Sequence, residues 1–227
     1  MIEKMALVTG ASSGIGQAIV NRLLDEGWQV IGLSRSAINR ADTGWQSHQI
    51  DISDSAALQA LLDKLPVPQA VIHAAGMMQA ASLGELDLNA STRLWQLHVA
   101  AAEQLANHFA PRMSAGGRIV LLGSRTSGGA SGRSQYVATK SAMIGMVRSW
   151  AAELAPRGIT ANIVAPGATE TPMLQQPGRA SSPPRLPPIG RYIQPQAVAG
   201  LAGFLLSPAA ATITGPPLVM CGGASLS

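Results

Sequence analysis

The chain has 227 residues, of which 47% are hydrophobic, 12% charged and 4% aromatic. This length suits one well-buried domain rather than two, and so apolar a composition excludes a disordered chain. The formal net charge is +4, but the sixteen Lys and Arg residues are scattered along the sequence, which argues against a nucleic-acid binder and fits an anionic small ligand.

The compartment is indicated by three further features. A single cysteine, Cys221, excludes an internal disulfide and is typical of a reducing environment. The first residues run directly into a short apolar strand without the pattern of a signal peptide, and no stretch approaches the roughly eighteen apolar residues of a membrane span. We therefore expect a cytoplasmic protein without membrane contact.

Strand-like and helix-like segments alternate from the beginning of the chain. The apolar run Met5–Thr9 predicts a strand, and a glycine turn connects it to a helix at Ile15–Glu26 that Gly27 would cap. Trp28–Ser34 predicts the second strand. The later predicted strands are His48–Ile52, Gln69–Ala75, Arg118–Gly123, Thr160–Ala165 and Pro217–Cys221. The later predicted helices run from an N-cap at Ser53 through Leu62, over a long region at about Leu88–Met113, over Ser134–Ala155 and at about Ala197–Leu206.

This alternation favours parallel pairing with right-handed crossovers. The predicted fold class is therefore α/β: a Rossmann-like, doubly wound, mostly seven-stranded parallel sheet with helices on both faces, in a single domain over 1–227. The segment Pro177–Pro188 contains five prolines, which exclude helix and central strand. It is either a surface connection or, since it follows the carboxyl end of a strand, part of a substrate lid, which we expect at 172–195.

The first turn reads TGASSGIG and places glycines 10, 14 and 16 between a strand and a helix. Without side chains they let the backbone approach a pyrophosphate, while the helix N-terminus supplies N–H donors and a positive dipole end. The turn is thus predicted to bind a dinucleotide through Gly10, Ser12, Ser13, Gly14, Ile15 and Gly16.

The same turn also satisfies G-x-S-x-G, the sequence form of a hydrolase nucleophile elbow. Only nine residues precede it, and no histidine follows His108, where the rest of a catalytic triad would be expected. A serine hydrolase is therefore a minor alternative.

The second predicted strand ends in Ser34-Arg35, without the acidic residue that a free ribose 2′-hydroxyl would favour. A hydroxyl followed by a guanidinium suits a 2′-phosphate, so we expect NADP(H), with NAD(H) as the alternative. Asp51 and Ile52, which close the predicted third strand, would flank the adenine.

Tyr136 and Lys140 lie one turn apart near the start of a predicted helix and share a face. A neighbouring ammonium favours the phenolate and lowers the pKa of a phenol, which could then exchange a proton with a carbonyl or alcohol oxygen. Ser124, at the end of the preceding strand, could hydrogen-bond that oxygen or simply begin a polar turn.

From end to end, the chain resembles the short-chain dehydrogenase/reductase family. The resemblance depends on the glycine turn, His73-Ala74-Ala75-Gly76 after the fourth strand, the set Ser124, Tyr136 and Lys140, Pro166-Gly167 with Thr169 and Thr171, and Gly222-Gly223.

The resemblance implies a role for each matching position. Ser124 would orient the substrate oxygen, Tyr136 would transfer the proton, Lys140 would bind the nicotinamide ribose, Thr171 would contact the nicotinamide amide and Asn162 would be structural. The implied cofactor site also includes Ala74, Ala75, Gly76, Pro166, Gly167 and Thr169. The resemblance also implies a homotetramer or homodimer. Separately, His48, His73 and His108 show no metal-ligand spacing, and we expect no metal.

Three departures from the family pattern stand out. His73 and Ala74 replace two asparagines that usually follow the fourth strand. His98 replaces a helical asparagine whose kinked backbone holds a water of the proton relay; it could hold that water, relay protons itself with a near-neutral pKa, or be a packed helix residue. Ser124 and Tyr136 are one residue closer together than is common.

The sequence thus predicts an NADP(H)-dependent oxidoreductase that acts on a small carbonyl or alcohol substrate, with Ser124, Tyr136, Lys140 and His98 at its catalytic centre. The alternative is a binding or regulatory protein that senses the cofactor with little turnover, which the substitution at His98 would fit.

Overall fold

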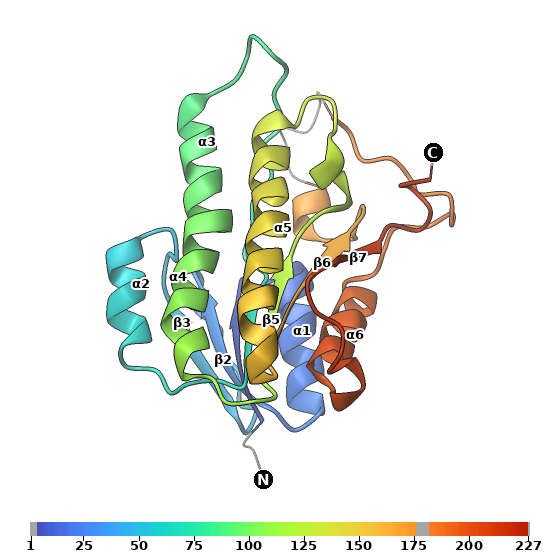
Figure 1. The fold of residues 1–227 in the computed structure, drawn as a ribbon. Helices are drawn as coiled ribbons and strands as arrows, with labels where there is room; N and C mark the ends of the chain where they lie inside the picture. Colours follow the sequence, from blue (N-terminus) through green and yellow to red (C-terminus); the bar gives the residue numbers. More distant parts are fainter. Residues whose placement is uncertain (1–3, 176–181, 227) are drawn as a thin grey trace.

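The computed structural model describes residues 4–175 and 182–226. Seven parallel strands form one sheet in the order β3-β2-β1-β4-β5-β6-β7, with helices on both faces (Figure 1). The predicted doubly wound α/β fold is therefore confirmed. The strands are β1 (Met5–Thr9), β2 (Gln29–Ser34), β3 (Trp45–Gln49), β4 (Ala70–His73), β5 (Arg118–Leu122), β6 (Thr160–Pro166) and β7 (Pro217–Met220).

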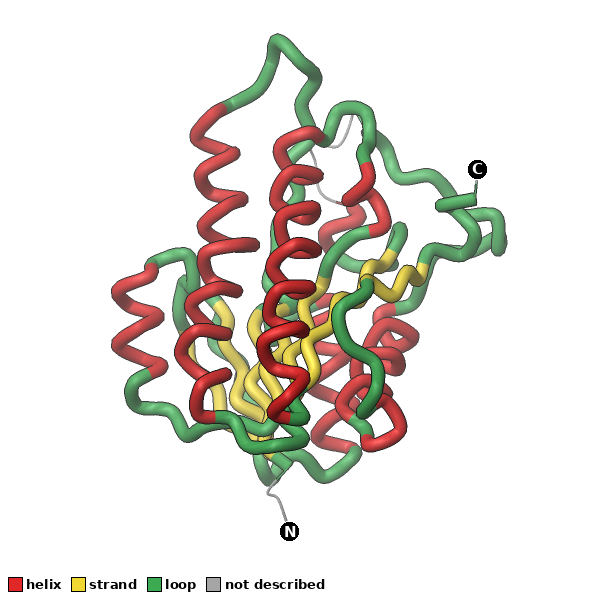
Figure 2. The backbone as a smooth tube through the Cα atoms, in the orientation of Figure 1, coloured by secondary structure: helices red, strands yellow, loops and turns green. Residues whose placement is uncertain are grey.

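Figure 2 shows the sheet between two helical layers. One layer contains α1 and α6, which pack against each other, and the other contains α2, α4 and α5. Among the described residues no helix is both long and apolar enough to cross a membrane. The helices are α1 (Gly14–Asp25), α2 (Ser55–Leu62), α3 (Leu88–Trp95), α4 (Ala101–Phe109), α5 (Ser134–Leu154) and α6 (Pro195–Leu206).

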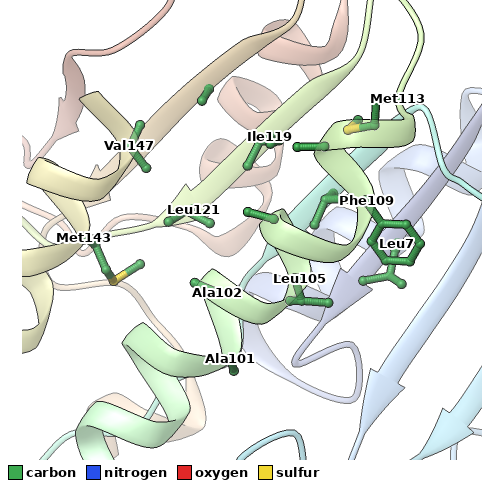
Figure 3. Packing of buried hydrophobic residues seen from close by; sticks show 14 of the residues in the cluster. Leu7, Ala101, Ala102, Leu105, Phe109, Met113, Ile119, Leu121, Met143 and Val147 are labelled. Carbon is green, nitrogen blue, oxygen red and sulfur yellow. The ribbon is translucent and has the colours of Figure 1, made fainter. Parts of the chain in front are cut away.

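Each face of the sheet has its own apolar core, because successive side chains of a strand point to opposite faces. On β1, Leu7 belongs to the core under α4 and α5, whereas Ala6 and Val8 belong to the core under α1 and α6. Figure 3 shows the first of these cores, where Phe109 of α4 and Met143 of α5 pack toward the sheet. The strands are apolar on both faces because both are covered.

The strand order reverses between β1 and β4. The chain proceeds from β1 outward to β3 and then returns to place β4 on the other side of β1. Adjacent connections leave the sheet in opposite directions at such a point, and a crevice opens beyond the carboxyl ends of the strands. The fold therefore directs the segments after β1, β4, β5 and β6 to one site.

Some predicted boundaries are wrong. The third strand is Trp45–Gln49 and not His48–Ile52, because the edge strand β3 is mostly exposed and lacks an apolar run. Asp54, not Ser53, caps α2, because its carboxylate accepts the N–H of Ala57. The N–H of Ser53 instead donates to the Asp51 carboxylate. The last helix begins at Pro195 rather than Ala197.

The long helical region predicted at Leu88–Met113 is not one regular α-helix. A π-helical turn, Gln96–Ala100, separates α3 from α4, and a 3₁₀ turn follows α4 at Ala110–Arg112. Such π turns are found frequently at functional sites. His98 lies in the middle of this one and is fully buried.

Candidate active site

Segments that follow β4, β5 and β6 line a cavity of about 710 Å³. The structure brings together there most of the residues predicted for the cofactor and the chemistry. The proline-rich segment also reaches this cavity through Ser182–Leu186; its residues 176–181 lie outside the described part of the chain. The predicted residues on the cavity wall are Ile15, Ala74, Ala75, Gly76, His98, Ser124, Tyr136, Lys140, Pro166, Gly167, Thr169 and Thr171.

The glycine turn lies against two of these walls. Gly10 has φ +68°, and a Cβ there would lie 2.8 Å from the backbone of Ala75. A Cβ on Gly14 would lie 3.2 Å from the Thr171 side chain, and one on Gly16 would overlap the carbonyl oxygen of Gly10. Only glycine fits this close approach of backbone to backbone, as a pyrophosphate cradle at a helix N-terminus requires.

The start of α1 keeps its backbone donors available. Ser13 is the N-cap residue, but its side chain makes no capping hydrogen bond. In the described part of the chain, the N-cap side chain therefore leaves the first N–H groups of the helix uncapped, and an anionic group can bind at such a helix start. The turn with its predicted Ser12 and Ser13 therefore fits the pyrophosphate of a dinucleotide.

The residues predicted for the adenosine end lie at the end of β2 and after β3, outside the cavity lining. Ser34 is buried and its hydroxyl donates to the Ser36 carbonyl at 2.7 Å, whereas Arg35 is exposed. Hydrogen bonds from Ser53 lower the pKa of the Asp51 carboxyl, and the charge of Arg35 adds to this effect. Ile52 is buried.

Tyr136 and Lys140 are both buried on one face of α5. The Lys140 Nζ donates to the Leu122 carbonyl at 2.7 Å and lies 5.8 Å from the centroid of the Tyr136 ring. Desolvation lowers the pKa of the Lys140 amine from 10.5 to about 7. Ser124 completes the set: its Oγ lies 2.8 Å from Thr126 Oγ1 and accepts the Thr126 N–H.

Both ring nitrogens of His98 have protein partners. Nε2 accepts the Met77 N–H at 3.0 Å, so the ring hydrogen is on Nδ1, which donates to Thr139 Oγ1 at 2.9 Å. The Thr139 hydroxyl then donates to the Tyr136 carbonyl at 2.8 Å. Burial lowers the pKa of His98 well below 6.5. This shift favours the neutral imidazole, and both ring nitrogens are occupied by protein partners, as expected of a packed helix residue. That His98 takes part in proton transfer stays a prediction.

His73 is a second buried histidine. Thr9 Oγ1 accepts the N–H groups of Ala74 and Ala75, each at 3.1 Å, and donates to His73 Nδ1 at 3.0 Å. Burial, with a further contribution from the charge of Lys140, lowers the pKa of His73 to about 3. Sequence reasoning missed Thr9, although its place directly before the glycine turn was visible.

The chain is similar to known proteins over nearly its whole length. The family model described as enoyl-(acyl carrier protein) reductase matches residues 10–225. The 3-oxoacyl-[acyl-carrier-protein] reductase of Vibrio cholerae is 33% identical over 242 residues, which cover 97% of this chain and 96% of that protein. The chain belongs to the short-chain dehydrogenase/reductase family.

Of two further similar proteins, one is named for nucleotide binding and the other for dehydrogenase activity. The cyclic-di-GMP-binding biofilm dispersal mediator protein of Escherichia coli is 33% identical over 224 residues, which cover 93% of each chain. A solved 4-hydroxyisoleucine dehydrogenase complexed with NADH is 27% identical with a TM-score of 0.87, and the match covers 99% of both chains. Together with the family, the site indicates an oxidoreductase with a nicotinamide cofactor and gives no support to a serine hydrolase.

Proposed function

We propose that this short-chain dehydrogenase/reductase interconverts a small carbonyl compound and its alcohol with NADP(H), using Tyr136 as the general acid/base. The observation that carries the proposal is the meeting of Ser124, Tyr136 and Lys140 in one cavity of about 710 Å³. The buried amine of Lys140 lies close to the Tyr136 ring, as a proton-transferring phenol requires.

The chemistry follows from these side chains. The bound nicotinamide would supply the hydride that adds to the carbonyl carbon in the reductive direction. The Tyr136 O–H bond breaks as its proton goes to the carbonyl oxygen, and the product is the alcohol. Ser124 would hold that oxygen by a hydrogen bond, and Lys140 would bind the ribose and favour the phenolate left on Tyr136. His98 acts here as a positioning residue, because both of its ring nitrogens are hydrogen-bonded to protein groups.

The cofactor would lie along the glycine turn and the walls after β4 and β6. We assign the pyrophosphate to the turn from Gly10 to Gly16 and the nicotinamide end to Ala74–Gly76 and Pro166–Thr171. Ser34 and Arg35 at the end of β2 would bind a 2′-phosphate, and Asp51 and Ile52 would flank the adenine. The exposed guanidinium of Arg35 supports NADP(H) over NAD(H).

A fluorescence titration with NADPH and with NADH, repeated on Arg35→Ala, tests the cofactor assignment. We expect the wild type to prefer NADPH, and the variant to lose about tenfold or more of its NADPH affinity, the value of a charge-assisted hydrogen bond. Arg148→Ala, at an exposed position of α5, is the matched control. Equal affinities for NADPH and NADH in the wild type would contradict the assignment.

Cytoplasmic location and assembly into a homotetramer or homodimer belong to the same proposal. They are supported by the family resemblance and by the single buried cysteine. Light scattering behind size-exclusion chromatography would measure the assembly.

A second candidate is a regulatory protein that binds a nucleotide and has little turnover. The Escherichia coli relative named for cyclic-di-GMP binding and the replacement of the family asparagine by a neutral His98 favour it. Tight NADPH binding with no reduction of any member of an aldehyde and ketone panel would support this candidate over the enzyme.

A further inference from the structure

Three arginines line the cavity beyond the predicted catalytic set: Arg125, Arg133 and Arg185, here called the substrate-side arginines. Arg125 directly follows Ser124, Arg133 is the N-cap residue of α5, and Arg185 belongs to the proline-rich segment. None of them comes from the glycine turn or from the end of β2, where the cofactor's phosphates are proposed to bind. Their charge therefore lies on the substrate side of the cavity.

No acidic residue balances this charge on the described part of the cavity wall, where neither Asp nor Glu occurs. Arg125 and Arg185 also form no ion pair with any described residue. Arg125 and Arg133 are half-buried, and Arg185 is exposed. A half-buried positive charge next to low-dielectric protein attracts an anion more strongly than the same charge in open water.

Two of the arginines are held in place by neutral groups. Arg125 Nη1 donates to the Ala224 carbonyl at 3.1 Å. Arg133 donates from Nε to Ser182 Oγ at 2.6 Å and from Nη2 to the Ser182 carbonyl at 2.8 Å. These contacts orient the guanidinium groups of Arg125 and Arg133, and the Ala224 carbonyl carries no formal charge that would offset the charge of Arg125. A pre-oriented fork of donors suits the planar oxygens of a carboxylate.

We propose that the substrate is a small oxo acid or hydroxy acid whose carboxylate binds Arg125, with Arg133 and Arg185 beside it. Its carbonyl or hydroxyl oxygen lies at Tyr136, so the inference rests on the proposed function. The cavity also has apolar walls at Met77 and Leu186 and must hold the nicotinamide, which leaves room for a small molecule. A phosphate monoester offers similar oxygens, and the test below separates the two anions.

The test uses pairs of substrates that differ only in charge. Purified full-length protein with saturating NADPH is assayed for kcat/KM on short oxo acids, on their methyl esters and on oxo phosphates of the same chain length. We expect the acids to exceed the esters by about tenfold or more, as a charge-assisted pair would give, and to exceed the phosphates. In Arg125→Gln the acid-to-ester ratio should fall toward one, Arg125→Lys should keep part of it, and Arg148→Gln should leave it unchanged.

A second measurement needs no variant and so does not depend on Arg125→Gln folding. Saturated monocarboxylic and dicarboxylic acids should inhibit the wild type in competition with the oxo substrate, and the matching amides should not. Esters turned over as well as acids, or amides that inhibit equally, would overturn the carboxylate inference while leaving the reductase intact. Phosphates preferred over acids would also overturn it. If no carbonyl of any charge is reduced, the proposed function itself fails, so the two failures are distinguishable.

Discussion

The Nδ1 atom of His98 lies 2.9 Å from Oγ1 of Thr139, and this hydrogen bond joins the π-helical turn to α5. Since Nε2 of the same ring accepts the Met77 N–H, one imidazole links the segment after β4 to the helix that carries Tyr136 and Lys140. The ring of His98 also meets the Tyr136 ring edge-to-face, with centroids 5.7 Å apart. The position of the phenol therefore depends on a neutral histidine.

Replacing His98 with alanine is expected to lower the free energy of unfolding by about 2–4 kcal/mol, because a cavity forms and the Met77 N–H loses its acceptor. Urea unfolding measures this. His48→Ala is the control with a much smaller expected change, within about 1 kcal/mol, because His48 is half-buried in the mostly exposed edge strand β3 and, among the described residues, its ring contacts only the exposed Gln46 by a hydrogen bond. Since burial lowers the pKa of His98 well below 6.5, nitrogen NMR of the wild type should find its ring neutral at pH 6.5, with the hydrogen on Nδ1. A ring that titrates near pH 6.5 would contradict this arrangement.

Lys140 makes stability depend on pH. Its pKa is 10.5 in the unfolded chain and about 7 in the folded one, so between these values the unfolded chain binds a proton that the folded chain does not. The free energy of unfolding should therefore rise with pH from about 7 to about 10.5, and the full cost of the buried charge is present below pH 7.

Lys140→Met removes that charge and keeps the shape. At pH 7 we expect the free energy of unfolding of the variant to be higher than that of the wild type by about 1–3 kcal/mol. This gain is smaller than the shift in the pKa of Lys140 alone would give, because the Leu122 carbonyl loses its donor. Denaturant unfolding at several pH values should show the advantage shrinking as pH rises toward 10, with turnover abolished throughout. Lys64→Met, at an exposed position, should give no such trend. A constant difference across pH would mean that Lys140 is not desolvated.

Gly16→Ala tests the glycine turn. Its Cβ would overlap the Gly10 carbonyl, so the turn cannot form unchanged, and we expect a loss of about 3 kcal/mol or more together with loss of NADPH binding. Gly145→Ala is the matched control, because no atom lies within 4 Å of its added Cβ inside α5. That change should stabilise the protein by about 0.5–1 kcal/mol in thermal unfolding. Wild-type NADPH affinity in Gly16→Ala would place the dinucleotide elsewhere.

Most of the fold could be predicted because the central strands are buried on both faces and read as apolar runs, as at Val30–Leu33 and Arg118–Leu122. The edge strand β3 could not be predicted correctly, because its mostly exposed residues form no apolar run. The apolar Ile50 and Ile52 follow it, and the strand was therefore predicted three residues too late. The π-helical turn carries no signal in the local pattern of Gln96–Ala100, and only the family resemblance, with its kinked backbone at the position of His98, pointed to an irregular helix there.

The candidate site divides in the same way. Short local spacings predicted the glycine turn and the pair Tyr136 and Lys140. The structure places the pair on the wall of one cavity, to which the turn contributes only Ile15. The hydrogen bonds of Thr9 and the anchoring of Arg133 by Ser182 join residues that are far apart in the sequence. Such contacts follow from the folded topology and leave no signal in a single sequence.

Tyr136→Phe is the sharpest test of the chemistry, because it removes one oxygen and keeps the ring that packs against His98. We expect kcat/KM for carbonyl reduction to fall by about 10²–10⁴-fold, the usual contribution of a positioned general acid. The chain has only two tyrosines, so Tyr192→Phe is a matched control that should keep wild-type activity. Fluorescence titration should show that Tyr136→Phe still binds NADPH, since the glycine turn and Arg35 are intact. Turnover equal to the wild type would assign the proton transfer to another group, and a wild type that binds NADPH but reduces nothing would favour the regulatory protein.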